Sequence, residues 1–270
     1  MIPETAPTRI TEDAWLIPHL MPAGPDSFVP VNSMVIRGAQ PVIVDTGAPI
    51  HRETWLHGVF SLVEPDDVRW VFLSHDDSDH VGNIEQVLDA CPNATVITNF
   101  FSCERMAAAT PLPLHRVRWL EPGESVDVGD RVLHAVLPPL FDAPTTRGLY
   151  DARTGVLWAA DSFACPTVGA VHRQEDLPAG MWDDAFLPFN SMLAPWHAWL
   201  DRAVFRRHVD SLEALRLSAI ASGHGPILTG DAIDDAFRRV RAMAGEPAVP
   251  TPGQSLLDSI LEAASLGVPA

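Results

Sequence analysis

The chain of 270 residues is 47% hydrophobic and carries a formal net charge of −17. This apolar content suffices for one large domain or two small ones. The acidic balance argues against a nucleic-acid-binding surface, which needs basic side chains. No run of about 18 uncharged apolar residues occurs, so we predict no membrane-spanning segment. The N-terminal residues lack the basic and apolar regions of an export signal, and the three cysteines show no CxxC spacing. We therefore expect a soluble cytoplasmic protein with buried free thiols.

The first part of the chain alternates strand and helix signals. Apolar runs bounded by turn residues predict strands over 14–17, 28–29, 33–37 and 41–45. The turn residues at 37–41 predict a hairpin between the last two strands. Helical spacing over 51–63 is followed by a buried strand over 70–73, a helix over 83–90, a strand over 94–98 and a helix from about 102 to 109. This order predicts helices packed on a sheet in an α/β arrangement.

The second part returns to strands and ends in helices. Strands are predicted between 117 and 137 and over 156–160, the latter after a hairpin turn at 150–155. The longest helical stretch is expected over 196–217, followed by a last short strand at 218–222 and a helix over 231–244. Residues 246–253 are proline-rich and indicate a linker. Beyond it, a short amphipathic helix from Leu256 to Leu266 is expected to pack against the body or a second subunit.

The loop after the strand at 70–73 concentrates potential metal ligands. His75, Asp77, Asp79 and His80 place four donors within six residues. A strand end followed by a tight loop can aim several donors at one point, and imidazole with carboxylate suits zinc, iron or manganese. A solvated polar turn would account for an isolated His-x-Asp pair. The density of donors in this loop instead favours a metal site.

Three later apolar segments also end at a potential ligand. Asp142 follows residues 137–141, Asp161 follows residues 156–160, and His224 follows residues 220–223. Each repeats the pattern of the first loop, in which an apolar strand runs into a turn that delivers a donor. Donors that are far apart in the sequence are therefore candidates for a common site.

These motifs together carry a family resemblance. The His-x-Asp-x-Asp-His loop, the Leu-Trp-Ala-Ala-Asp-Ser-Phe segment at 157–163 and the Ser-Gly-His-Gly-Pro turn at 222–226 resemble the metallo-β-lactamase superfamily. Within it they most resemble the flavodiiron proteins, whose loop carries an acidic residue where the hydrolases carry a second histidine. The likeness covers roughly residues 10–245. It implies an α/β fold, a single-domain αββα sandwich over residues 1–245 with two metal ions at one edge of the sheets. Residues 246–270 would then form the linker and short helix.

The resemblance also implies a ligand set. His75 and Asp77 would hold the first metal, while Asp79, His80 and His224 would hold the second. Asp161 would bridge the two. In the relatives, the counterpart of His80 binds metal in some members and turns away in others.

Two positions depart from the family pattern. The relatives usually carry glutamate where this chain has Asp77, and the third histidine of the first metal falls on Asp142. His134, eight residues earlier in a strand, is an alternative donor. If the Asp142 side chain cannot reach the first metal, that position would bind its metal weakly or stay empty. Asp45 and Ser74 are candidates for orienting the loop or a ligating imidazole, although Asp45 is equally well placed to be an ordinary turn residue.

The charge of the donor set bears on the metal. Asp77, Asp79, Asp142 and Asp161 would bring four carboxylates, which neutralise two divalent ions. An anionic, oxygen-rich shell weakens a Lewis acid but stabilises a trivalent metal, which favours iron or manganese and oxygen chemistry over water activation by zinc. Iron is therefore the favoured cofactor, with manganese or zinc as alternatives.

An aromatic-rich stretch between Trp182 and Trp199 precedes the long predicted helix. Half of it is expected in the core and part as the wall of a dry pocket above the metals, as in the relatives. His197 within it is a candidate proton donor, with an exposed helical histidine as the alternative.

The sequence is compatible with three functions. The first is a dinuclear, diiron protein that binds, senses or reduces O2 or a related small oxidant, an oxidoreductase in the enzymatic case. No FMN-binding flavodoxin domain is expected, because the metal domain accounts for the 270 residues. A reductase would therefore need a separate electron-donor protein, whereas a sensor would not, and a homodimer is considered. The alternatives are a metal-dependent hydrolase of an ester, lactone or phosphoester and a non-catalytic binding domain with a degraded metal site.

Overall fold

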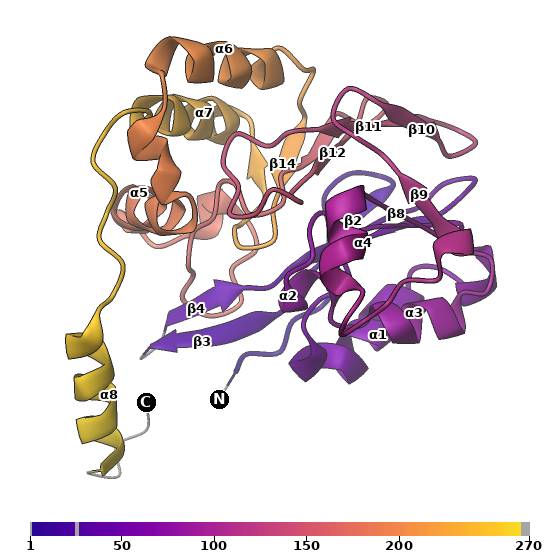
Figure 1. Ribbon diagram of the computed structural model, residues 1–270, viewed down its shortest axis with the longest axis horizontal. Coiled ribbons are helices and arrows are strands. Elements are labelled where there is room, and N and C mark those ends of the chain that lie inside the picture. Colours follow the sequence, from indigo (N-terminus) through magenta and orange to yellow (C-terminus); the bar gives the residue numbers. More distant parts are fainter. Residues whose placement is uncertain (1, 25–26, 266–270) are drawn as a thin grey trace.

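Two facing β-sheets form the centre of the protein in the computed structural model, which describes residues 2–24 and 27–265 (Figure 1). The first sheet has the strand order β1-β2-β5-β6-β7-β8-β9. Its strands are β1 (Thr8–Arg9), β2 (Ala14–Ile17), β5 (Ser33–Ile36), β6 (Val42–Val44), β7 (Trp70–Phe72), β8 (Thr95–Thr98) and β9 (Val117–Trp119). From β6 to β9 the neighbours run parallel, as expected for strands joined by helical crossovers.

The second sheet has the strands in sequence order from β10 to β15. They are β10 (Ser125–Asp127), β11 (Val132–Val136), β12 (Gly148–Asp151), β13 (Val156–Trp158), β14 (Ala219–Ala221) and β15 (Leu228–Thr229). All neighbours are antiparallel except β13 and β14, which are joined by a long helical connection and run parallel. A separate hairpin consists of β3 (Leu20–Gly24) and β4 (Ser27–Pro30).

Helices cover the outer face of each sheet. On the first sheet lie α1 (Arg52–Phe60), α2 (Ser78–Val81), α3 (Ile84–Ala90) and α4 (Phe100–Met106). On the second lie α5 (Met181–Leu193), α6 (Arg202–Glu213) and α7 (Asp231–Met243), which gather on the opposite side of the molecule in Figure 1. This αββα layering confirms the predicted fold class.

Three apolar clusters hold the layers together. Between the sheets, residues such as Phe72, Ile97 and Trp158 pack in a buried core. One outer cluster joins the first sheet to α1 and α3 through Trp55 and neighbouring aliphatic side chains. The other joins the second sheet to α5, α6 and α7 through Phe186, Phe205 and Phe237. Each sheet is therefore apolar on both faces, which explains why its strands read as continuous apolar runs.

The predicted helix over 196–217 is wrong in its first part. A 3-10 turn over Pro195–Trp199 comes first, and α6 begins only after Asp201, whose side chain accepts hydrogen bonds from the backbone N–H groups of Ala203 and Val204. This N-cap stops the helix from extending backward. The preceding helix α5 was not predicted, because Pro188 lies inside it and proline argues against a helix interior. The strand at 218–222 is not the last, since β15 follows it.

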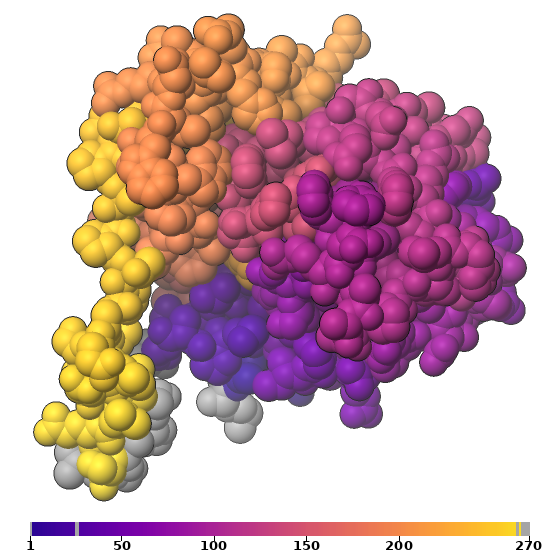
Figure 2. Space-filling view, viewed as in Figure 1, coloured from indigo at the N-terminus to yellow at the C-terminus, as the bar shows by residue number. Residues whose placement is uncertain are grey.

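The C-terminal helix α8 (Gln254–Ser265) lies at the margin of the body, the yellow segment at lower left in Figure 2. Every α8 side chain whose exposure is described is exposed to solvent, so these residues do not pack against the body as considered from sequence, and packing on a second subunit stays a prediction. The predicted end of this helix, Leu266, lies outside the described residues, and the division into residues 1–245 and 246–270 stays a prediction. Within the described chain, no helix has both the length and the apolar character needed to cross a membrane.

Candidate metal centre

The candidate ligands arrive at one edge of the sandwich because they follow the carboxyl ends of parallel strands. β6 leads to Asp45, and its parallel neighbour β7 leads through Leu73 to the loop that begins at Ser74. In the second sheet, β13 leads to Asp161 and the parallel strand β14 leads to His224. Parallel strands end on the same side of a sheet. The two sheets therefore bring these side chains together although they are far apart in the sequence.

The seven predicted ligands form three overlapping groups, in each of which the donor atoms lie within 4.8 Å of one another. One group is His75, Asp77 and Asp142, another is Asp79, His80 and His224, and the third is His75, His80 and Asp161. The third group shares a histidine with each of the others. The arrangement thus has two outer groups joined through Asp161.

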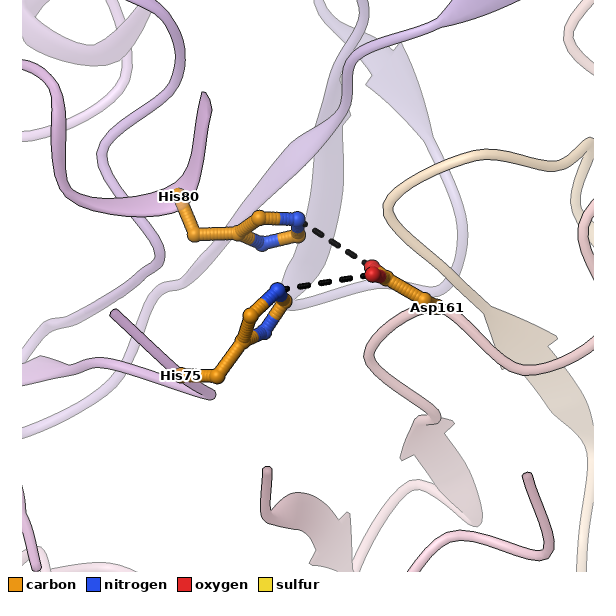
Figure 3. Close-up of side chains that lie close together, drawn as sticks. All are labelled: His75, His80 and Asp161. Carbon is orange, nitrogen blue, oxygen red and sulfur yellow. Dashed lines mark ion pairs between the residues drawn. The ribbon is translucent and has the colours of Figure 1, made fainter. Parts of the chain in front are cut away.

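The carboxylate of Asp161 points toward the imidazoles of His75 and His80 (Figure 3). Its Oδ2 is 3.4 Å from Nε2 of His75, and its Oδ1 is 3.1 Å from Nε2 of His80. The same Oδ1 is 3.5 Å from Nε2 of His224. A single buried carboxylate therefore faces all three histidines.

The outer carboxylates lie beside these imidazoles. Asp77 Oδ2 is 3.9 Å from Nε2 of His75, and Asp79 Oδ2 is 3.4 Å from Nε2 of His224. Asp142 is more exposed than the other donors, and its Oδ1 lies 3.4 Å from the hydroxyl of Thr146. The centre thus opens toward solvent on its Asp142 side.

His134, the alternative donor, belongs to none of the ligand groups found among the described residues. It lies on β11 opposite Tyr150 of β12, with the two ring centroids 6.3 Å apart. The donor that the structure places beside His75 is Asp142 rather than this strand histidine.

A hydrogen-bond network fixes the orientation of the two loop imidazoles. Nδ1 of His80 is 2.9 Å from Asp45 Oδ2 and donates to it. The Ser74 hydroxyl donates to the same Oδ2 at 2.7 Å and accepts a hydrogen bond from Nδ1 of His75 at 3.0 Å. This pattern places a proton on Nδ1 of both rings, so Nε2 is the nitrogen left to bind a cation at the centre.

Asp45 is the hub of this network. It is completely buried, and besides His80 and the Ser74 hydroxyl it accepts bonds from the Ser74 backbone N–H at 2.6 Å and from Trp158 Nε1 at 3.0 Å. Asp45 therefore lies in the turn at the end of β6 and also orients the candidate ligand His80. Trp158, whose role the sequence did not indicate, links this network to the core between the sheets.

Left-handed backbone conformations surround the centre. In the described part of the chain, the non-glycine residues with positive φ are Asp45 (58°), Ala160 (48°) and Phe163 (64°). The first orients His80 and the other two flank Asp161. Such conformations cost energy and concentrate at functional sites. The strain therefore lies where the backbone must turn to present these side chains.

Several buried polar atoms at the centre lack protein partners. Nε2 of His75, Nε2 of His80 and Oδ1 of Asp161 form no hydrogen bond with any residue that the structure describes. An unsatisfied buried polar group costs about 1–3 kcal/mol, so several together at one point call for an explanation. Cations between the imidazoles and the carboxylates would satisfy all of these atoms, and the donor set therefore fits metal ions.

Close packing around these atoms explains why residue 223 is a glycine. A Cβ on Gly223 would lie 2.7 Å from His80 Cε1 and 3.0 Å from Asp161 Oδ1. Any side chain at this position would push into the space between the candidate ligands. The glycine next to His224 is thus required by the approach of the backbone to the centre.

The pKa values of the central groups are shifted by their mutual charges. Burial acts to lower the pKa of His80, but Asp161 and Asp45 outweigh it and raise this pKa well above the usual value. The pKa of His75 is also raised: burial and His80 oppose the shift, and Asp161 contributes most to it. Burial acts to raise the pKa of Asp161, but the three histidines hold it well below its usual range. Protons and cations therefore compete for the same nitrogen atoms.

The other sequence candidates lie away from this centre. His197 is buried, where Nδ1 donates to the Met243 carbonyl at 2.8 Å and Nε2 is 2.9 Å from the Ser191 hydroxyl, so it is not the exposed histidine considered from sequence. In the aromatic stretch, Phe186 belongs to the core, whereas Trp199 is 88% exposed. The three cysteines are buried and free, as predicted, and burial raises the pKa of Cys91 to about 11.

The layered fold and the cluster of donors at its edge define a class, the metal-binding αββα proteins of the metallo-β-lactamase superfamily. A sequence model described as "ODP family beta lactamase" matches residues 29–225, and the chain belongs to this family.

Similar proteins include several that carry flavodiiron names. A protein of Nostoc sp. named "Putative diflavin flavoprotein A 2" is 29% identical over 198 residues, which cover 73% of this chain and 33% of the relative. The chain thus spans about a third of the length of that relative. A "Flavo-diiron protein FprA2" from Clostridium acetobutylicum is 21% identical over 212 residues, covering 75% of this chain and 50% of the relative. The predicted resemblance to the flavodiiron branch is confirmed.

Solved structures show the same fold. The flavodiiron protein from Giardia intestinalis superposes with a TM-score of 0.76 at 16% identity, covering 89% of this chain and 59% of that one. The rubredoxin oxygen:oxidoreductase from Desulfovibrio gigas gives a TM-score of 0.75 at 16% identity, covering 87% and 61% of the two chains. At this identity the likeness establishes the architecture.

Proposed function

We propose that this protein holds two metal ions, with iron favoured, and uses them to bind, sense or reduce O2 or a related small oxidant. The observation that carries the proposal is the pair of outer donor groups joined through the buried carboxylate of Asp161. Each outer group has three residues, and Asp161 can add a ligand to both. Iron in such a pair supplies reversible one-electron chemistry when bound.

The residues take distinct roles in this proposal. His75, Asp77 and Asp142 hold the first ion, and Asp79, His80 and His224 hold the second. Asp161 bridges the two positions. Asp45 and Ser74 hold His75 and His80 so that their Nε2 atoms face the ions.

The charge of the donor set supports an iron centre with oxygen chemistry rather than a zinc centre that catalyses hydrolysis. The four carboxylates of Asp77, Asp79, Asp142 and Asp161 balance two divalent ions, so the centre has little net positive charge left to acidify a bound water. The same carboxylates stabilise a higher oxidation state of the metal. Manganese fits this set next best.

The names of the relatives extend the proposal to partners. One is called a diflavin flavoprotein and another a rubredoxin oxygen:oxidoreductase. For the present chain we propose that a reductase function draws electrons from a separate donor protein, which a sensor would not need. We also propose that two copies of the chain associate as a homodimer. The substrate is a small molecule that reaches the centre from its exposed Asp142 side.

The test is an anaerobic metal analysis with an absorption spectrum before and after exposure to air. The protein is produced in iron-supplemented medium, with the Asp161→Ala variant as the control. We expect about two iron ions per chain and an absorption band that changes with oxygen and is missing from the variant. Zinc content with ester hydrolysis would replace the proposal by the hydrolase alternative. A protein that stays metal-free in both iron- and zinc-supplemented media would contradict any metal-dependent function.

A further inference from the structure

Buried asparagines accompany the candidate ligands. The chain has five asparagines, at positions 32, 83, 93, 99 and 190. All of them except Asn93 are at most 2% exposed. In each of these four, the side-chain nitrogen donates to the backbone carbonyl of a loop near the centre. Two of the four contact a loop that serves only one of the outer donor groups, and these two carry the inference.

Asn32 forms hydrogen bonds with the backbone on both sides of His224. Its Nδ2 donates to the carbonyls of Ser222 and Gly225, both at 2.9 Å, and its backbone N–H donates to the Gly223 carbonyl at 2.8 Å. Two residues earlier, the Pro30 carbonyl accepts a hydrogen bond from Nδ1 of His224 at 2.8 Å. Asn32 lies between β4 and β5, whereas His224 follows β14 of the second sheet. This contact therefore fixes the position of His224 relative to the loop of the first sheet that carries Asp79 and His80.

Asn99 holds the loop of Asp142 in a similar way. Its Nδ2 donates to the Thr145 carbonyl at 2.8 Å, while its Oδ1 caps α4 by accepting from the Ser102 N–H at 3.1 Å. The hydroxyl of Thr145 in turn donates to Asp76, the residue after His75, at 2.6 Å. Asn99 thus connects the Asp142 loop to the end of β8 and to the loop that carries the other donors of the first position.

We propose that Asn32 and Asn99 are positioning residues with separate targets: Asn32 sets the metal affinity of the second position through His224, and Asn99 sets that of the first through Asp142. The proposal rests on the two-metal function proposed above. Both side chains act through the backbone of a loop and touch no candidate ligand atom. Because His224 and Asp142 belong to different outer groups, loss of either asparagine affects one ion and spares the other.

The substitutions Asn32→Ser and Asn99→Ser remove the amide donors. Serine at position 99 keeps an oxygen that caps α4, so helix formation is retained. Loss of a contact that orients a ligand typically lowers metal affinity by about 10–100-fold. Asn190→Ser is the matched control. Asn190 is equally buried and donates to the Ala164 carbonyl at 2.8 Å, on the loop after Asp161, which faces both outer groups.

The measurement is a titration with Co²⁺, followed by its visible absorption and by metal analysis. A position counts as holding an ion when it is more than half filled at a free concentration about tenfold above its own wild-type Kd, which a 10–100-fold loss of affinity prevents. We expect two ions for the wild type, one for each asparagine variant and none for the double variant. The decisive pair adds Asp142→Ala. Asn99→Ser with Asp142→Ala should keep one ion, because both changes affect the first position, whereas Asn32→Ser with Asp142→Ala should keep none. In Asn190→Ser, any loss should be shared by both positions.

The outcomes separate the two levels of the proposal. A wild-type protein that binds fewer than two ions refutes the proposed function. Asp142→Ala retaining two ions refutes the ligand set at the first position. If the wild type binds two ions and Asp142→Ala loses one, two results would show that separate positioning is wrong. One is that Asn32→Ser with Asp142→Ala still keeps one ion. The other is that a single asparagine substitution removes both ions. Circular dichroism verifies folding, and Asn32→Asp, which keeps the side-chain shape, replaces Asn32→Ser if the latter does not fold.

Discussion

Two pairs of neighbouring histidines in this protein have pKa values shifted in opposite directions. His75 and His80 at the candidate centre have ring centroids 3.9 Å apart, and the pKa of each is raised. His19 and His51, near α1, stack with centroids 4.8 Å apart, and the pKa of each is lowered. Burial and His51 lower the pKa of His19 to about 4.

The difference lies in the carboxylates. His80 is 2.9 Å from Asp45 and 3.1 Å from Asp161, whereas Nε2 of His19 meets only a hydroxyl, that of Thr54 at 3.0 Å, among the residues described. Burial alone favours a neutral imidazole. The pair at the centre attracts positive charge because buried acids surround it, and the pair near α1 does not. A buried cluster of histidines is therefore insufficient evidence of a metal site.

The largest effect is expected from removing the carboxylate that both positions share. Asp161→Ala should reduce the metal content from about two ions per chain to nearly none, because Asp161 faces all three histidines. His134→Ala is the control and should leave the content unchanged, since His134 lies outside the ligand groups. Mass-spectrometric metal analysis provides the measurement. A variant at position 161 with an unchanged metal count would refute the bridging role.

Removal of the buried acid behind the imidazoles should mainly affect stability. Asp45→Ala leaves the hydrogen-bond donors of His80, Ser74 and Trp158 without an acceptor. Breaking such a buried charged network typically costs about 3–5 kcal/mol. We expect a decrease of this size in the free energy of unfolding of chelator-treated protein, measured with urea. A decrease below about 1 kcal/mol, the size of one ordinary hydrogen bond, would mean that Asp45 does not organise the pair.

A smaller effect is expected from making the first position richer in imidazole. Asp142→His should raise its affinity for zinc by on the order of tenfold, about 1.4 kcal/mol, because imidazole is a preferred zinc ligand. Competitive titration of zinc against a coloured chelator measures this change. Indifference of binding to the substitution would show that Asp142 is no ligand.

The pair near α1 should give the free energy of unfolding a pH dependence. Because the pKa of His19 is about 4 in the folded protein and about 6.5 when unfolded, the unfolded chain binds more protons between these values. His19 therefore contributes stability above pH 6.5 that is lost as the pH falls toward 4, with a slope of at most about 1.4 kcal/mol per pH unit. His19→Gln should flatten this dependence in urea unfolding of chelator-treated protein. Equal slopes for wild type and variant would argue against a neutral buried His19.

The donors could be found from the sequence because each follows an apolar strand at a turn. The same rule located Asp45, although not its four hydrogen bonds, which depend on Trp158 from the other sheet. The contacts of Asn32 could not be predicted, since its partners at Ser222 and Gly225 lie at the other end of the chain. Helix α5 was missed because Pro188 contradicts local propensity, whereas packing of Phe186 against the second sheet stabilises it. Local sequence patterns thus predicted the strand ends well, but they could not predict contacts between residues far apart in the sequence.

The candidate ligands come from both sheets of the sandwich, and this has a mechanical consequence. Ions held at the edge would cross-link the two halves of the molecule, through the loop at 75–80 in the first half of the sequence and through Asp142, Asp161 and His224 in the second. Such a link restricts the unfolded chain most when it closes a long loop. Loading the centre should therefore make the two halves unfold as a single cooperative unit.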